Sequence, residues 1–201
     1  MEKENVLDKT ICKFPEKIDS IQSIIIGLIG FLVPTFLAQL MNTIFGIQSI
    51  ISINSQIIVG SIVNAILVIS AINIKGYKKI VGIVTMPSIS TILSGYVFGT
   101  ASVYMVYMVP AIWLGNFVLI YAYKFILLEK KKNYFLAGIV GIIAKILVIF
   151  ATFEMLNLFS VFPTKLVSSL QVAMGTTQLI TACIGMLVAF VIYQVEKRYK
   201  K

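Results

Sequence analysis

Long runs of apolar residues without charge recur along almost the whole chain. A transmembrane α-helix needs about 20 consecutive apolar residues. Of the 201 residues, 59% are hydrophobic and only 12% are charged, which excludes an ordinary water-soluble domain. We therefore expect an all-α integral membrane protein whose single membrane domain occupies residues 21–195. The runs predict six transmembrane helices, at about 21–45, 56–74, 80–98, 103–127, 133–153 and 176–194.

Lysine and arginine are concentrated in the breaks between alternate runs. This is the positive-inside pattern, and it predicts that both termini are cytoplasmic, as a polar tail at 1–20 and a basic tail at 196–201. The net charge of +9 then reports topology and attraction to anionic membrane lipids rather than nucleic-acid binding. Apart from Lys145 and Lys165, the basic residues fall in four clusters: Lys3, Lys9, Lys13 and Lys17; Lys75, Lys78 and Lys79; Lys124, Lys130, Lys131 and Lys132; and Lys197, Arg198, Lys200 and Lys201.

The sequence lacks the residue patterns of catalysis and of metal or cofactor binding. Histidine is absent, and the two cysteines, Cys12 and Cys183, lie in places that cannot plausibly be bridged. We therefore expect no disulfide, no metal site, no cofactor and no enzymatic activity. A glycine-rich phosphate loop of the GxxxxGK type is also missing. If the protein moves a solute against a gradient, another subunit must supply the energy.

One charge interrupts the apolar run 133–153. Lys145 lies about 12 Å below the nearer membrane face at ~1.5 Å per helical residue, where a charge costs on the order of 2.5–3.5 kcal/mol. No Asp or Glu lies inside any other apolar run. The ammonium could pair with a bound anion or a partner protein's carboxylate, or it could snorkel to water. A proton relay is disfavoured because His, Asp and Glu are all missing at this depth.

Polar and aromatic residues mark two further runs as walls of a pocket with Lys145. Tyr and Trp commonly sit at membrane interfaces, but Trp113 and Asn116 lie near the midplane of the run 103–127, where a cavity wall and plain packing are both open. We take Trp113 and Tyr107 as candidates for stacking on a ring. At the start of the run 176–194, Gln178 and Thr181 lie at roughly the level of Lys145. Thr177 and Gln178 could form hydrogen bonds with a solute.

Small and amide residues predict how the helices pack. Ser23 and Gly27 form a small-xxx-small pair on the first run, and Gly95 and Gly99 form another at the end of the third, where backbones could approach closely. We expect Asn64, inside the second run, to form hydrogen bonds across helices.

The connection 154–175 is apolar and is too short to span the membrane. Pro163 suits the first turn of a helix and Gly175 its end. These signals predict a short helix in the membrane interface or re-entrant beside the outer mouth.

Two segments carry a resemblance to a known family. The VPAIWLGN segment at 109–116 and the MGTTQLITACIG segment at 174–185, within six short helices, resemble the substrate-binding S component of an energy-coupling-factor (ECF) vitamin transporter. The resemblance implies a pocket in the outer half of the membrane, walled mainly by the last three helices. It also implies partners, namely one ECF membrane subunit and two ATPases, in the bacterial plasma membrane. Family members dock through the first helix, where Ser23 and Gly27 are the matching positions.

These observations favour capture of a small anionic or carboxylate-bearing micronutrient for an ATP-driven uptake system. Lys145 would pair with the anionic group of the nutrient. The alternative is a non-transporting membrane scaffold or assembly subunit with a similar helical core, in which Lys145 binds a partner's carboxylate. A scaffold would carry no solute when purified, and native mass spectrometry would distinguish the two functions.

Overall fold

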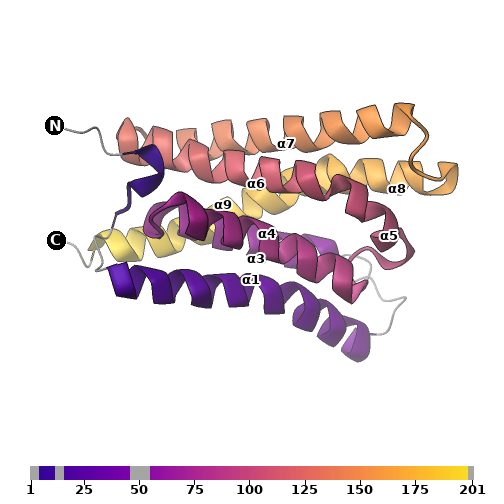
Figure 1. Cartoon of the computed structure of the whole chain (residues 1–201), viewed down its shortest axis with the longest axis horizontal. Helices are drawn as coiled ribbons and strands as arrows, with labels where there is room; N and C mark the ends of the chain where they lie inside the picture. The colour runs from indigo at the N-terminus through magenta and orange to yellow at the C-terminus, as the bar shows by residue number, and fades with distance from the viewer. Residues whose placement is uncertain (1–4, 12–15, 46–54, 199–201) are drawn as a thin grey trace.

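Long helices lie side by side along one axis in the computed structural model, with both ends of the chain at the same end of the bundle (Figure 1). The structure describes residues 5–11, 16–45 and 55–198. Within these residues every regular element is helical. The α-helices are α1 (Glu16–Phe45), α3 (Ser55–Asn73), α4 (Tyr77–Ser94), α5 (Ser102–Met105), α6 (Val109–Ala122), α7 (Tyr134–Leu158), α8 (Thr164–Met174) and α9 (Thr176–Arg198). Short 3₁₀ turns are η1 (Val6–Asp8), η2 (Gly99–Ala101) and η3 (Val106–Met108), and η4 (Tyr123–Glu129) is a π-helical turn.

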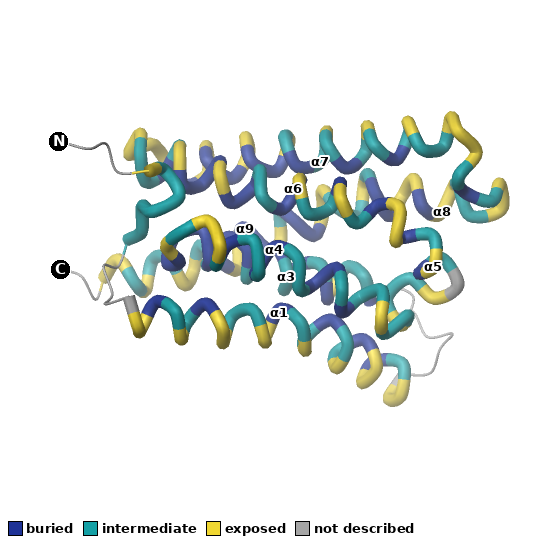
Figure 2. The backbone as a smooth tube through the Cα atoms, viewed as in Figure 1, coloured by how far each residue is buried: buried dark blue, intermediate teal, exposed yellow. Residues whose placement is uncertain are grey.

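Five of the described segments are long and apolar enough to cross a membrane, namely 17–44, 55–73, 102–129, 134–158 and 164–198. The chain is therefore compatible with a multi-pass membrane protein. Large apolar side chains are exposed along the outward sides of α1 and α7 (Figure 2), as expected where the solvent is lipid. The predicted six-helix count is not confirmed, because α4 falls outside these five. It begins at Tyr77, includes Lys78 and Lys79, and ends at Ser94, before Gly95, which has φ +68°.

Other predicted boundaries differ from the structure by a few residues. The first helix begins at Glu16 instead of residue 21, and α7 continues five residues past the predicted end at 153. The connection 154–175 contains the expected helix, α8, which ends before Gly175. Helix α8 runs alongside α7 and leads directly into α9 (Figure 1). Together α8 and α9 form one apolar segment.

The closest helix pair is α3 with α9, and glycines make the approach possible. A Cβ placed on Gly185 would lie 2.6 Å from Asn64 Cβ and 2.8 Å from the backbone N of Ala65. From the other side, a Cβ on Gly60 would lie 2.9 Å from Thr181 Cγ2. Such contacts are shorter than van der Waals distance, so only glycine fits at Gly185 without moving a helix. This close packing holds Asn64 and Thr181 against each other in the middle of the bundle.

Helices α1 and α4 each contain a proline and meet at a small polar cluster. The Ser90 hydroxyl donates to the backbone oxygen of Phe31. Because a hydroxyl has one proton, the Thr35 hydroxyl is the donor in its 2.6 Å bond to Ser90 Oγ. A proline inside a helix removes one backbone hydrogen bond, and neighbouring polar side chains commonly compensate in membrane helices.

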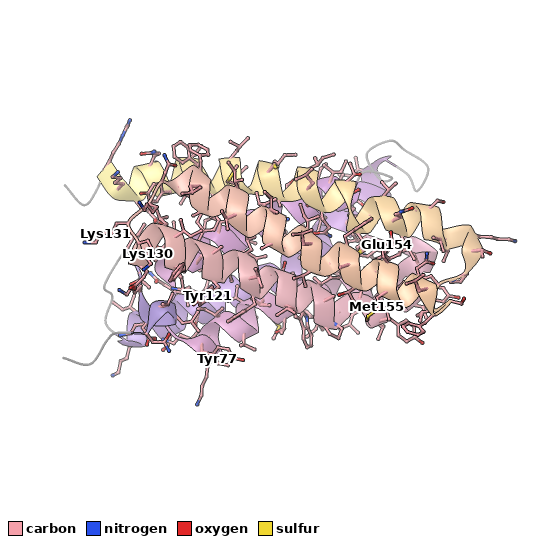
Figure 3. All side chains as sticks on the ribbon, turned by 90° about the horizontal axis from the view of Figure 1, so that it is seen from above. Tyr77, Tyr121, Lys130, Lys131, Glu154 and Met155 are labelled. Carbon is pink, nitrogen blue, oxygen red and sulfur yellow. The ribbon has the colours of Figure 1, made fainter. Side chains whose placement is uncertain are left out.

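The apolar interior divides into two clusters along the bundle axis. One joins the halves of α3, α4, α6, α7 and α9 nearest the chain termini and contains Leu67, Ile80 and Leu119. The other joins α5, α7 and α8 at the opposite end and contains Phe153 and Leu170. Figure 3 places Lys130 and Lys131 at the end with the termini, and Glu154 and Met155 toward the opposite end. We refer to these as the terminal end and the distal end.

The N-terminal segment, residues 5–11, is part of the packed structure at the terminal end. The backbone N–H of Ile11 donates to Ile72 O at 2.8 Å, and that of Gly76 donates to Leu7 O at 3.1 Å. The side chains of Leu7 and Ile11 pack against the first apolar cluster. Gly76 has φ +90°, a conformation that favours glycine. The described part of the predicted polar tail is thus bound to the ends of the helices.

A buried lysine fastens this segment. Lys124, on η4, is 0% exposed, and its Nζ donates to Lys9 O at 2.6 Å and Ile74 O at 2.8 Å. The sequence analysis counted Lys124 in the basic cluster of the connection that follows, although residue 124 also falls inside the predicted helix 103–127. The helical path continues past Lys124 as η4 to Glu129, and the side chain points into the bundle, unlike the exposed Lys130, Lys131 and Lys132.

Candidate functional site

A cavity of about 80 Å³ lies in the distal half of the bundle, between α3, α4, α6, α7 and α9. Its walls combine apolar side chains with an unusual number of polar groups for the interior of a membrane protein. Val97 and Phe98, in the turn after α4, line it as well. The polar residues that line it are Gln56, Asn64, Ser88, Thr91, Asn116, Lys145 and Gln178.

Lys145 is 2% exposed, and α6 leaves room for it to reach the cavity. A Cβ placed on Gly115 would lie 3.2 Å from Lys145 Cγ, and one on Gly141 would lie 3.1 Å from Ala122 Cβ. Small residues at these points let α6 and α7 approach closely, so that the lysine stem is covered and its ammonium reaches the interior.

The Lys145 ammonium donates to Asn64 Oδ1 at 2.6 Å. The Asn64 amide nitrogen donates in turn to Gly60 O at 2.8 Å and to Thr181 Oγ1 at 3.3 Å. The Thr181 hydroxyl donates to Gln178 O at 3.1 Å. Both amide protons of Asn64 are used, so its oxygen must face the lysine. This confirms the prediction that Asn64 forms hydrogen bonds across helices.

The charge of Lys145 has no carboxylate partner in the described part of the chain. The ion pairs found there are Lys9 with Glu129 and Lys79 with Asp19, both near the terminal end. An ammonium has three donors, and among described residues only Asn64 accepts from Lys145. Two of the three donors of the ammonium therefore have no described acceptor beside the cavity.

Three more polar side chains of the cavity wall have no hydrogen-bond partner among the described residues. Asn116 is 3% exposed and Ser88 is 7% exposed, and neither side chain forms a hydrogen bond with any described residue. The same is true of the Gln178 amide. Buried polar groups are nearly always hydrogen-bonded to protein or to water. A polar occupant of the cavity would satisfy them.

The cavity brings together three of the six predicted binding residues, namely Lys145, Asn116 and Gln178. Tyr107 is 56% exposed and lies outside it. The 3₁₀ turn η3 interrupts the helix before α6, so the buried side chains there are Met105 and Met108, and Tyr107 faces outward.

Trp113 and Thr177 also lie outside the cavity. Trp113 packs against the first apolar cluster, and its indole N–H is buried without an acceptor among described residues. Thr177 lines a separate hollow between the start of α3 and α8, because it is one residue, or about 100° of helix, away from Gln178. The expected stacking pair, Trp113 with Tyr107, is thus not assembled next to Lys145.

Sequence reasoning did not assign Asn64 and Ser88 to the site. Asn64 was expected to form hydrogen bonds across helices, which it does, but it was not placed among the binding residues; its oxygen is the one described acceptor of Lys145. Ser88 follows Pro87 inside an apolar helix, and that pair was the available signal. Neither residue carries a charge that would have marked it.

The predicted docking pair on α1 is divided between two environments. Ser23 is 9% exposed, and its hydroxyl donates to Ser20 O at 2.8 Å. A Cβ placed on Gly27 would meet nothing within 4 Å. Gly95 and Gly99 likewise meet nothing within 4 Å and have φ +68° and +55°, so the prediction that they bring backbones together is wrong. They form the turn that carries Val97 and Phe98.

No protein-family model, curated protein or solved structure matches this chain.

Proposed function

We propose that the chain is the substrate-capture subunit of an ATP-driven uptake system for a small anionic or carboxylate-bearing micronutrient. The observation that carries the proposal is the buried Lys145 ammonium, which faces a polar cavity and has no described acidic partner. A charge in this position is costly, and an anionic solute would compensate it. Asn116 and Gln178 would form hydrogen bonds with the polar edges of the solute.

The energy would come from other proteins. The sequence has no nucleotide-binding motif and no carboxylate inside an apolar run, so coupling to ATP, protons or sodium within this chain has no residues to carry it. An ECF membrane subunit with two ATPases, in the bacterial plasma membrane, would supply it. In this proposal α4 is the sixth membrane helix and both termini are cytoplasmic.

The turn at the distal end would act as the lid of the pocket. A cavity of about 80 Å³ is smaller than the roughly 300–1,000 Å³ of pockets for drug-sized ligands. Val97 and Phe98 line it from a turn between Gly95 and Gly99, both in left-handed conformations. Rotation at these glycines would uncover the cavity for a larger solute, because hinges are formed by a few loop residues.

The same volume favours a second candidate function, a non-transporting membrane scaffold or assembly subunit. If the cavity stays at about 80 Å³, it has room for waters and a small ion but not for a vitamin. Lys145 would then be held by Asn64 and a few waters, and the protein would serve as a surface for partner helices.

Copurification distinguishes these functions. The tagged chain expressed in a host with ECF modules is expected to copurify with a membrane subunit and two ATPases. Gly27→Leu should weaken this several-fold without changing stability, because the added side chain points into open space. Gly82→Leu on α4, also open to 4 Å, is the matched control. ATPase-free accumulation of solute by the isolated chain would contradict the proposal, and a chain that never carries solute or ATPases would favour the scaffold.

A further inference from the structure

We propose that the distal cavity is a binding site for one small, planar, monovalent oxyanion, of the kind represented by acetate or nitrate, held between Lys145, Asn116 and Ser88. This rests on the same cavity as the proposed function and names the group that the cavity recognises. A larger nutrient would place only its carboxylate here and keep the remainder beneath the turn with Val97 and Phe98.

Charge is the first reason. Lys145 is 2% exposed and has no ion pair with any described residue. All eight acidic residues of the chain lie outside the middle of the apolar runs, so no part of this chain can bring a carboxylate to that depth. One monovalent anion in the cavity gives a neutral site, whereas a neutral ligand or a divalent anion leaves net charge in a medium that stabilises charge poorly.

The second reason is the balance of donors and acceptors. Lys145 has two unused N–H donors, the Asn116 amide contributes two more, and the Ser88 hydroxyl one. Asn64 Oδ1 already accepts from Lys145, and the Thr91 hydroxyl donates its one proton to Pro87 O at 2.7 Å, so Thr91 adds no donor to the cavity. A ligand with two or three acceptor oxygens can use the donors of Lys145, Asn116 and Ser88. Carboxylate and nitrate both have two or three acceptor oxygens in one plane.

Helix geometry adds to the preference for an anion. Gln178 lies in the first turn of α9 (Thr176–Arg198) and lines the cavity. The N-terminal end of a helix carries partial positive charge, so α9 favours the same sign of ligand as Lys145. This contribution supports the side-chain donors and is not needed to define the site.

Size sets the upper limit. The cavity of about 80 Å³ corresponds to two or three waters at ~30 Å³ each. That space holds a planar anion of about four non-hydrogen atoms. A longer carbon chain would have to extend past lining residues such as Val97 and Phe98, so we expect affinity to fall as the carbon chain grows.

Calorimetric titration of the full chain in nanodiscs tests the site. The probes are sodium salts of acetate, nitrate, propionate and hexanoate, at constant ionic strength, with sodium chloride in the reference. We expect saturable 1:1 binding of acetate or nitrate and at least tenfold weaker binding of hexanoate. The ratio of acetate to nitrate affinity tells whether a carboxylate or an inorganic oxyanion suits the site better, and either order supports it.

Three variants assign the binding to this cavity. Lys145→Met should weaken acetate or nitrate binding about 30-fold or more, since it removes the charged partner of a buried pair. Asn116→Leu keeps the size of the side chain, removes its donors and should weaken binding several-fold. Lys165→Met removes a positive charge at an exposed position on α8 and should leave the affinity unchanged.

The absence of saturable binding, or equal affinity in wild type and Lys145→Met, would overturn the proposal and leave a water-filled cavity. If Lys145→Met does not fold, Asn116→Leu decides by the same criterion. The transport proposal can be contradicted independently of this site.

If the chain binds the anion but no ATPases copurify with it, the transport proposal is contradicted and the oxyanion site stands. The protein could instead retain a solute that acetate does not displace and whose binding Asn116→Leu does not weaken. That result would contradict the oxyanion site and leave the transport proposal standing.

Discussion

Two lysines are buried among the residues that the structure describes, and their surroundings differ. Lys124 is 0% exposed, and its ammonium donates to two backbone oxygens, of Lys9 and Ile74. Lys145 is 2% exposed, and its ammonium donates to one side-chain oxygen, of Asn64, beside a cavity with unpartnered polar groups. Burial is therefore the same, and the number of acceptors provided by the fold distinguishes the two.

The acceptors of Lys124 explain why that residue is structural. Ile74 follows the last residue of α3, where carbonyl groups have no partner within the helix. A lysine is well suited to such carbonyls, because both its donors and its charge match the C-terminal end of a helix. Lys145 lies in the middle of α7 and meets no helix end in this way. The two lysines are equally buried, and they differ in how many acceptors the described residues provide.

The largest effect is expected from Lys124→Met. This change leaves two buried carbonyl groups without donors and releases the N-terminal segment, at a cost of roughly 3 kcal/mol, since hydrogen bonds to charged groups contribute about 1.5–3 kcal/mol each. Unfolding in mixed micelles would give the free energy, and proteolysis would report the released segment. A stability equal to that of wild type would show that the hydrogen bonds of Lys124 do not hold the N-terminal segment in place. The structural difference between Lys124 and Lys145 would then have no effect on stability.

An intermediate effect is expected from Gly185→Ala. The added Cβ would lie 2.6 Å from Asn64 Cβ, so α3 and α9 must separate, at a cost of about 1–3 kcal/mol. Because Asn64 moves, acetate or nitrate affinity should also fall while the N-terminal segment stays protected. Gly82→Ala, which meets nothing within 4 Å, is the control and should keep both properties. Unchanged anion affinity in Gly185→Ala would show that Asn64 does not position Lys145.

The smallest change in stability is expected from Lys145→Met, and most of its expected range has the opposite sign. Removing the charge relieves on the order of 2.5–3.5 kcal/mol, whereas Asn64 Oδ1 loses its donor at about 1–3 kcal/mol. The variant should range from about 0.5 kcal/mol less stable to about 2.5 kcal/mol more stable than wild type. The measurement is the same unfolding titration, without added anion. A loss as large as that in Lys124→Met would place both lysines in the same structural class.

Helix positions and the depth of Lys145 were accessible from the sequence because both depend on length and charge. The run 56–74 corresponds closely to α3 (Ser55–Asn73), and the start of α9 falls at Thr176 as expected. The length of an apolar run determines whether a helix can span the lipid bilayer. Each run can therefore be recognised without knowing how the helices pack. The same reasoning identified Lys145 as exceptional and Asn64 as a residue that contacts another helix.

What the sequence could not indicate depends on rotation about helix axes and on contacts between distant segments. A 3₁₀ turn of three residues before α6 turns Tyr107 outward, and no residue pattern announces it. Lys124 was grouped with its exposed neighbours, because its acceptors come from residues 9 and 74, far away along the chain. The division of Ser23 and Gly27 between a covered and an open position likewise depends on how α1 lies against α4.

The bond between Lys124 and Lys9 joins residues 115 positions apart, and this has a consequence for the order of assembly. Residue 9 leaves the ribosome long before residue 124 is made, an interval of about 6 to 23 s at 5–20 residues per second. During that time the first residues of the chain have no lysine to bind and Ile74 O has no donor. The segment that holds Lys9 is thus among the last parts of this chain to find its place, although it is made long before Lys124, and anything fused close ahead of it competes with this final step.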